Sequence, residues 1–447
     1  MVKLIISFNA LLLGIFFLFN HSEKNKTVPE MPMCSMMQEN GINKWSNATH
    51  FIQYQAIKAT PGLFETDSEK AYSMPLLTQT PQGDVMLTWT EKDEQGMSSL
   101  CFSISKDKGK TFSDKKIIYS GTGINNSRLS RAKVLTKKDG SLVAVFSNRV
   151  DAPSSTTAQT QPQGQGERGR GGRGGGRSSA LVYCISKNNG ATWSNPQQVD
   201  TDPTQGLMRG FFDAIVLPND EIAVAYLKDV KNSTKNEERD LRLAITKNGV
   251  FQPEKLIDPV VCDCCNINLL IDSNGAFHVY YRDNNDNIRD IARLTSTDNG
   301  ETFSKSQIVY NDGWKIDGCP HSGAISCANG KSALLAWYSG SDTEPGIRLV
   351  NQEGKKLFVL DDNLVKNPAL MTSPQVSAML WEQAGDKSQL IFRTIIGDKF
   401  SGNKAIENTI NATNATGLII DNQLLAAYEV KQENKKNSLK ISMADLK

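Results

Sequence analysis

Histidine is scarce in this sequence, with 4 among 447 residues, and aromatic side chains make up only 7%. Neither sign of charge dominates, because 50 Lys and Arg residues face 48 Asp and Glu residues. The chain therefore lacks the global positive field that draws proteins onto nucleic acid, and we expect no nucleic-acid partner. With 34 Gly, 16 Pro and 22% charged residues, the composition also excludes collagen, coiled-coil, wholly disordered and multi-span membrane proteins.

One apolar run stands at the start of the sequence. After Lys3, the residues from Leu4 to Phe19 contain only Ser7 and Asn9 as clearly polar breaks. About sixteen residues are short for a membrane-spanning helix, which needs roughly twenty, and are typical of a secretory signal. We predict an exported protein, periplasmic, at the cell surface or secreted, with residues 1–20 as the signal and 21–49 as a linker. Because no small-x-small cleavage pair follows, an uncleaved anchor stays open as the one membrane contact.

Short strand-like runs recur along the rest of the chain. Seven share a stretch of mostly apolar residues that ends near an aromatic one: VMLTWTE (85–91), LVAVFSN (142–148), IAVAYLK (222–228), FHVYYRD (277–283), LLAWYS (334–339), SAMLWEQ (377–383) and LLAAYEV (424–430). A second apolar run and a turn signal precede each of them, such as PQGD at 81–84. Each unit therefore contains a predicted hairpin.

A more specific signal follows several units: Ser-x-Asp-x-Gly-x-Thr and then an aromatic residue. It is complete at 105–112 and 296–303, has Asn188 in place of Asp at 186–193, and survives in part as Thr246, Asn248 and Gly249. In such a turn the Asp or Asn side chain binds backbone amides, Gly supplies a positive φ, and the aromatic packs between sheets. We expect these boxes to be structural turns without a catalytic role.

These boxes, in register with the strand pairs, resemble the Asp-box or BNR repeats of the sialidase (neuraminidase) superfamily. The resemblance covers residues 70–310 directly and the rest by strand pattern, and it implies an all-β fold, a β-propeller of the sialidase type. Such sialidases usually have six blades, but the seven hairpins here favour seven over six, in one domain over 50–447. The segment FIQYQAI (51–57) is predicted to form the outer strand of the last blade and close the ring.

In such a propeller the Asp boxes lie on one rim, and the blade entrances and the connections between second and third strands lie on the other. We predict that this other rim carries the site for a glycan or another anionic small molecule. Its candidate acid or base residues are Asp213, Asp283 and Asp290, and its candidate substrate-binding residues are Arg131, Arg209, Arg282, Arg289 and Trp314, with Arg128 nearby. Charged loops that merely solvate the surface are the alternative interpretation.

The cysteines divide by position. Three fall inside predicted strands, where they act as small buried hydrophobic residues, and Cys34 lies in the linker: the three are Cys101, Cys184 and Cys327. The other four enter two adjacent blades at the predicted site rim, together with one histidine: Cys262, Cys264, Cys265, Cys319 and His321. We predict that these five residues form one cluster beside Arg282 and Arg289.

Three interpretations of this cluster stay open. Disulfides come first in an exported protein. A bridge between the neighbours Cys264 and Cys265 would be strained, however. Disulfides therefore cannot easily form within the cluster without leaving a free thiol near His321. A thiolate and imidazole site for copper or zinc is the second interpretation, and free thiols are the third.

The resemblance to active sialidases fails at one position. Those enzymes carry an arginine in a Tyr/Phe-Arg-Ile-Pro segment that grips the substrate carboxylate, but the matching residues here are Tyr72, Ser73, Met74 and Pro75. A bidentate contact is therefore missing. The chain is more similar to secreted bacterial sialidase-like proteins with a Cys-rich blade entrance. Two functions stay open: a glycoside hydrolase with a non-standard site, or a non-catalytic propeller that binds a glycan, a metal or a protein. We expect a monomer.

Residues 152–179, which include GQGERGRGGRGGGRSS, depart from globular composition. They are predicted to form a disordered insertion between the second and third strands of blade two, on the site rim. The insertion contains four arginines and one acidic residue, Glu167. It could therefore contact an acidic polymer or serve as a flexible spacer, and both interpretations stay open.

Overall fold

The structure is a computed structural model that describes residues 54–151, 177–204, 207–231, 233, 238–330, 332–362, 364–432 and 436–446. The predicted signal, the linker and residues 152–176 of the insertion lie outside this range. Within it the chain forms strands and turns, and none of the described segments is a helix that could cross a membrane. The strands belong to one unit, Thr49–Lys447.

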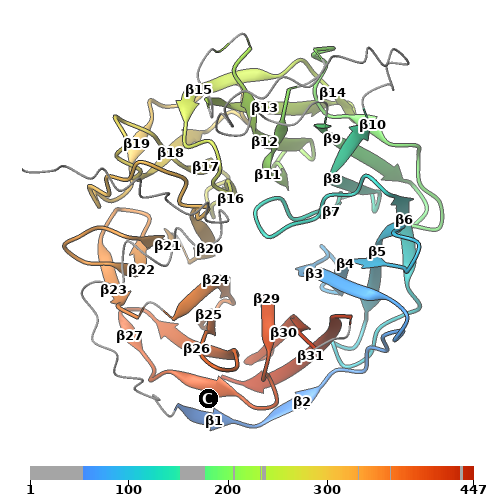
Figure 1. Ribbon diagram of the computed structural model, residues 1–447, viewed down its shortest axis with the longest axis vertical. Coiled ribbons are helices and arrows are strands. Elements are labelled where there is room, and N and C mark those ends of the chain that lie inside the picture. Colours follow the sequence, from blue (N-terminus) through green and yellow to red (C-terminus); the bar gives the residue numbers. More distant parts are fainter. Residues whose placement is uncertain are drawn as a thin grey trace, which may run out of the picture. The chain divides into compact units, whose positions relative to one another are not determined.

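Seven sheets surround a central channel as the blades of a propeller, and in each blade the first strand of its hairpin is innermost (Figure 1). Five blades have four strands: blade one, β3 (Ala71–Gln79), β4 (Val85–Lys92), β5 (Ser98–Ser105) and β6 (Lys116–Gly121); blade two, β7 (Lys133–Thr136), β8 (Leu142–Asp151), β9 (Arg177–Ser186) and β10 (Gln197–Gln198); blade four, β16 (Asn268–Ile271), β17 (Phe277–Arg282), β18 (Ile291–Ser296) and β19 (Gln307–Ile308); blade five, β20 (Ile325–Asn329), β21 (Ser332–Ser339), β22 (Gly346–Asn351) and β23 (Lys356–Leu360); and blade seven, β29 (Ala412–Ile420), β30 (Gln423–Val430), β31 (Ser438–Asp445) and β2 (Ala59–Pro61).

The remaining two blades carry additional strands. They are blade three, β11 (Arg209–Val216), β12 (Ile222–Asp229), β13 (Arg239–Lys247), β14 (Val250–Phe251) and β15 (Lys255–Val261); and blade six, β24 (Val365–Thr372), β25 (Ser377–Gln383), β26 (Gln389–Ile396), β27 (Lys399–Phe400), β28 (Lys404–Ile406) and β1 (Gln55–Ile57). The all-β propeller and the preference for seven blades are thus confirmed.

The N-terminal segment closes the ring, but not with the predicted residues. Strand β2 pairs antiparallel with β31 and forms the outer edge of blade seven. Strand β1, which lies in the 51–57 segment, pairs instead with β28 of blade six and runs parallel to it. The prediction that residues 51–57 complete the last blade is therefore wrong, because the next short strand, β2, takes that place. The chain passes two exposed edges in succession and covers both, and the sequence pattern cannot tell which edge each short strand meets.

The Asp boxes join the third and fourth strands of their blades, as the repeat predicts. In the first box Asp107 accepts hydrogen bonds from Ser105 Oγ (2.8 Å), Thr111 N (2.8 Å) and Thr111 Oγ1 (2.6 Å). The box glycines have positive φ, 91° at Gly109 and 76° at Gly190. A Cβ added to Gly190 would clash with the ring of Phe102 in blade one. The boxes therefore fix each turn and seat it against the preceding blade.

The innermost strands of four blades contain a bulge, and each bulge holds one non-glycine residue with positive φ: Met74 (52°), Phe211 (52°), Asn367 (49°) and Asn414 (54°). Buried glutamates of the second strands support three of them. Glu429 accepts from Met74 N at 2.8 Å and from Asn414 Nδ2 at 2.9 Å. Glu382 accepts from Asn367 Nδ2 at 2.8 Å. Bulges redirect side chains out of the regular ladder, and here they shape the wall of the channel.

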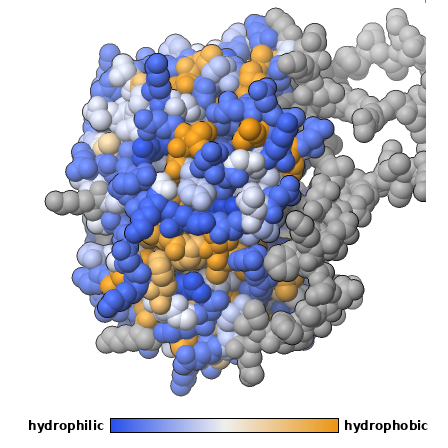
Figure 2. All heavy atoms as spheres, turned by 90° about the vertical axis from the view of Figure 1, so that its left-hand side faces the viewer, coloured by the Kyte–Doolittle hydropathy of each residue, from blue (hydrophilic) through white to orange (hydrophobic). Residues whose placement is uncertain are grey.

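Large apolar side chains fill the spaces within and between blades, and Trp89, Trp337 and Trp381 are fully buried. The side of the molecule seen in Figure 2 is mostly hydrophilic, with hydrophobic residues in separate patches. Burial between blades is what holds the ring together.

Candidate functional site

A cavity of about 230 Å³ lies in the central channel, and the innermost strands of all seven blades contribute to its wall. Its charged lining residues are three cations, Arg128, Arg131 and Lys133, and one carboxylate, Asp213. Polar amides complete the wall: Asn266, Asn268, Asn367 and Asn414. Because blade entrances contribute to this lining, the cavity opens on the rim that the sequence predicted to carry the site. Its charge favours an anionic ligand.

Arg131 is a cation of this cavity whose hydrogen-bonding capacity is only partly used. Its Nη2 donates to the carbonyl oxygen of Asn414 at 3.3 Å, and its buried Nε has no partner among the described residues. Burial and the positive charge of Arg128 lower the pKa of Arg131 to about 10, although the negative charge of Glu429 opposes this shift. A guanidinium whose charge is poorly compensated is stabilised by a bound anion. Of the predicted substrate-binding residues, Arg131 alone lines the cavity.

Asp213 also lines the cavity, but both its oxygens are engaged. Oδ1 accepts from Ala214 N at 2.9 Å and pairs with Lys133 Nζ at 2.7 Å, and Oδ2 accepts from Leu269 N at 2.9 Å. All three contacts use the carboxylate oxygens as acceptors. Asp213 therefore serves to hold Lys133 and the start of blade four.

The other two predicted acids are absent from the cavity lining. Asp283 accepts from Asn284 N and Asn285 Nδ2, both at 2.8 Å, within its own loop. Asp290 is buried and accepts from Gly313 N at 3.1 Å and Trp314 N at 3.3 Å. Both carboxylates fix loops, so the structure does not bring the three predicted acids together around one ligand.

Three predicted substrate-binding arginines and Trp314 are packed into the protein. Arg282 donates to the carbonyl oxygens of Ser322 (2.7 Å), Tyr338 (2.8 Å) and Arg289, and its guanidinium lies 5.1 Å from the ring centroid of Trp314. Arg289 and Trp314 are more than nine-tenths buried beside it. Arg209, at the start of blade three, pairs with Asp200. Their hydrogen bonds join the blade entrances, and these residues stay clear of the cavity.

The Cys-rich entrance of blade four and the entrance of blade five meet next to the cavity. Asn266 Oδ1 accepts from Gly323 N at 2.8 Å, and Asn266 Nδ2 donates to Ala324 O at 3.1 Å. A side chain on Gly323 would collide with the backbone of Asn266. This close approach brings Cys319 and His321 to the three cysteines of the other loop.

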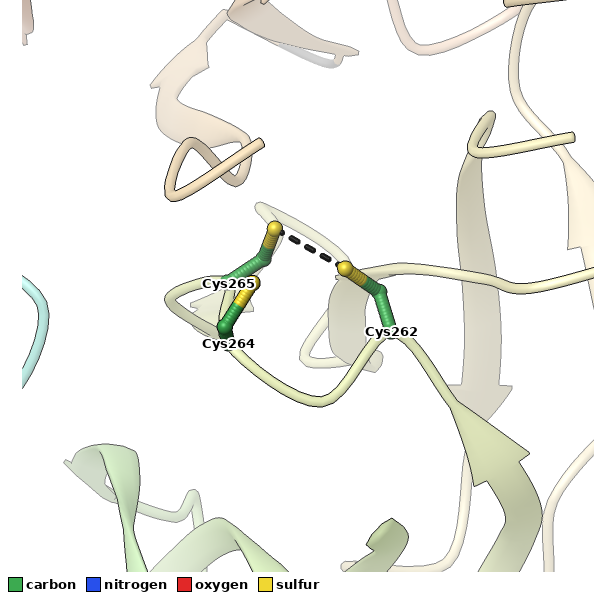
Figure 3. Close-up of side chains that lie close together, drawn as sticks. All are labelled: Cys262, Cys264 and Cys265. Carbon is green, nitrogen blue, oxygen red and sulfur yellow. Dashed lines mark hydrogen bonds between the residues drawn. The ribbon is translucent and has the colours of Figure 1, made fainter. Parts of the chain in front are cut away.

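The five predicted cluster residues lie together and form two sets of three. The sulfurs of Cys262, Cys264 and Cys265 are within 4.8 Å of one another, and so are the ligand atoms of Cys264, Cys319 and His321. The sulfurs of Cys262 and Cys265 are 3.1 Å apart (Figure 3). No disulfide joins the seven cysteines in the described part of the chain. Arg282 lies beside the cluster, because its carbonyl oxygen accepts from Cys262 N at 3.1 Å.

The thiols of this cluster differ in acidity. Burial alone raises the pKa of Cys265, but hydrogen bonds from Cys262 and Cys264, the charge of Arg282 and the Ser322 amide hold it well below its usual value. A hydrogen bond with Cys264 lowers the pKa of Cys262, yet the bond with Cys265 and burial outweigh it and raise that pKa to about 12. The pKa of Cys265 is therefore lower than that of Cys262.

Sequence reasoning missed the amides of the channel wall and the buried glutamates that support them. Asn367 and Asn414 occupy equivalent bulges, and Glu382 and Glu429 support them from the ends of neighbouring second strands. Burial raises the pKa of Glu382 although hydrogen bonds from Asn367 and Thr413 oppose this. A signal was present in the sequence, since an Asn lies two positions after the first residue of each of these strands. Its meaning, however, depends on the bulge.

Comparisons with known proteins agree with this architecture. Residues 160–359 match the family described as the BNR repeat-like domain. A protein of unknown function from Dyadobacter fermentans superposes with a TM-score of 0.51 at 13% identity, over 87% of this chain and 98% of that chain. An ulvan lyase, a polysaccharide lyase, gives 0.52 at 11% identity, over 85% and 95%.

Trypanosoma rangeli sialidase has a TM-score of 0.45 at 13% identity, over 87% of this chain and 58% of the sialidase chain. Curated protein sequences gave no match. The predicted resemblance to sialidase-like propellers with BNR repeats is confirmed.

Proposed function

We propose that this sialidase-like β-propeller with BNR repeats binds an anionic glycan in its central cavity and that Arg131 holds the negative group of the ligand. One observation carries the proposal: Arg131 lines the cavity, and Asp213, the one carboxylate among the described lining residues, is already paired with Lys133. A carboxylate or sulfate beside Arg131 would balance the charge of its guanidinium, whose pKa is lowered by burial.

Size and polarity support a saccharide. At about 230 Å³ the cavity is below the roughly 300 Å³ at which sites for drug-sized ligands begin, so it suits a terminal sugar or a short chain end. Side-chain amides around the wall match the hydroxyl groups of a sugar. The ulvan lyase with a similar fold has a solved complex with -[GlcA(1-4)Rha3S]-, an anionic saccharide.

Binding is favoured over glycoside hydrolysis. A glycosidase of the usual kind needs two carboxyl groups about 5 to 9.5 Å apart at the scissile bond. Asp213 is the single carboxylate among the described residues of the cavity wall, and its oxygens are occupied. The N-terminal apolar run favours a location outside the cytoplasm, where such glycans occur.

Calorimetric titration with a glucuronic-acid-terminated oligosaccharide tests the proposal, with the matching glucose-terminated oligosaccharide as the neutral control. We expect the acidic probe alone to bind, and more weakly at high salt. Arg131→Ala should weaken binding about 10- to 100-fold, the range of a charge-assisted hydrogen bond. Arg149→Ala is the matched control, because Arg149 is an exposed arginine of the same blade outside the cavity lining.

Equal binding of the acidic and neutral probes, or equal losses in the two arginine variants, would refute the proposal. Thermal unfolding of both variants establishes that they are folded at the titration temperature.

A further inference from the structure

We propose that Cys262, Cys264, Cys265, Cys319 and His321 bind a pair of Cu(I) ions, with the Cys264 sulfur as the bridge between them. This site is separate from the glycan cavity in its residues and in its chemistry. It does not depend on the proposed function.

The first ion is assigned to the three cysteines that enter blade four. Their sulfurs all lie within 4.8 Å of one another, and the three residues are at most 3% exposed. Figure 3 shows the sulfur of Cys265 directed at that of Cys262, with Cys264 next to it on the same loop. Soft thiolate donors select copper(I), zinc or iron–sulfur clusters and disfavour Mg²⁺ and Ca²⁺.

The second ion is assigned to Cys264, Cys319 and His321, whose ligand atoms also lie within 4.8 Å of one another. His321 Nδ1 is 3.0 Å from the carbonyl oxygen of Cys319. If Nδ1 carries the proton, this bond orients the ring and leaves Nε2 with the lone pair that a metal needs. His321 has a φ of 50°, in the left-handed region that few residues other than glycine occupy.

The grouping of the ligands favours Cu(I) over Zn²⁺. Structural zinc in proteins is almost always held by four ligands in a tetrahedron. Here the five ligand atoms form two sets of three that share one sulfur. Thiolates bind Cu(I) at lower coordination numbers than zinc, and a shared thiolate joins two such ions.

Positive groups surround the cluster and offset the charge of its thiolates. The charge of Arg282 acts on Cys265. Arg239 donates to the carbonyl oxygen of Asp263, within the same loop, and its guanidinium lies 5.4 Å from the ring centroid of Phe211, which packs against the cysteines. The Cys319 thiol donates a hydrogen bond to Asp263 Oδ1 at 3.3 Å, which orients its sulfur.

The experiment uses the full chain, reduced and kept free of oxygen, with Cu(I) delivered from its bathocuproine disulfonate complex. Elemental analysis after desalting measures copper per chain, and near-ultraviolet absorption reports thiolate-to-copper bonds. We expect about two copper ions per chain, the number that two ligand sets hold. Cys264→Ser should lose the bridge and fall to one copper or none.

His321→Ala should retain one copper ion, because it leaves the three-cysteine set intact. Cys327→Ser is the matched control, since Cys327 is a buried cysteine of β20 remote from the cluster, and it should still bind two. Circular dichroism checks that each variant is folded. If Cys264→Ser does not fold, His321→Ala decides, because His321 is partly exposed.

Four results would overturn the proposal. One is a reduced chain that retains no copper against the chelator. Another is equal copper content in Cys264→Ser or His321→Ala and in Cys327→Ser. The third is a single Zn²⁺ per chain that Cu(I) does not displace. The fourth is the persistence of disulfides within the cluster in mild reductant, as measured by counting thiols.

Discussion

Arg128 Nη2 donates a hydrogen bond to the carbonyl oxygen of His321 at 3.3 Å, across 193 positions of sequence. Arg128 precedes the first strand of blade two and lines the cavity, whereas His321 precedes blade five and belongs to the Cys/His cluster. This bond joins the two candidate sites at one mouth of the channel.

Arg128→Met should weaken binding of the glucuronic-acid-terminated probe about 10-fold, because one cation of the cavity is lost. Copper loading should stay at the wild-type value, since Arg128 holds the backbone of His321 and donates no ligand. Calorimetry and elemental analysis on the same preparation measure both. A loss of copper with unchanged glycan affinity would contradict the separation of the two sites.

The chain should not hydrolyse a fluorogenic sialoside at an ordinary sialidase rate. Ser73 stands where sialidases carry a carboxylate-binding arginine, and Ser73 Oγ is 3.5 Å from the Thr90 carbonyl oxygen, toward the neighbouring strand. Fluorescence release by the purified chain, measured beside an active sialidase, checks this. Turnover comparable with that enzyme would show that another residue replaces the arginine.

Gly190→Ala should destabilise the protein more than Gly140→Ala. Both glycines have positive φ, 76° and 81°, so alanine costs about 1 to 2 kcal/mol at either position. At Gly190 the added methyl group also collides with the Phe102 ring, whereas nothing lies within 4 Å of it at Gly140. Overpacking adds roughly 1 to 3 kcal/mol. Urea unfolding of both variants measures the difference. Equal losses of stability would show that the contact between Gly190 and the Phe102 ring accommodates the added methyl group.

Asp107 should make stability fall in acid. Hydrogen bonds from the Thr111 hydroxyl and amide hold its pKa at about 2, below the roughly 3.9 of an unfolded chain. Its contribution is therefore complete above about pH 4 and is lost as the pH falls through about 2. Asp107→Asn should be less sensitive to pH across this window, as measured by urea unfolding at each pH. The third box, where Asn188 already makes the equivalent bonds, has no such titration.

The repeat pattern determined the fold because it is local. Alternating apolar runs specify strands, and the Asp box specifies a turn whose hydrogen bonds all lie within seven residues, as in Ser105 to Thr111. Counting such units was enough to predict seven blades and the rim on which each connection lies. The grouping of Cys262, Cys264 and Cys265 with Cys319 and His321 followed from the same topology, because adjacent blades have adjacent entrances.

The tertiary structure alone decided which polar residues are free to bind. Asp213, Asp290 and Arg282 resemble site residues in sequence, yet contacts from distant loops occupy all of them. Arg131 differs from Arg282 in that its neighbours leave part of its guanidinium without a partner among the described residues. Such partners come from other blades, and the sequence does not encode their distances. The residues that close the ring, 59–61 in place of 51–57, depended in the same way on which strand edges remained exposed.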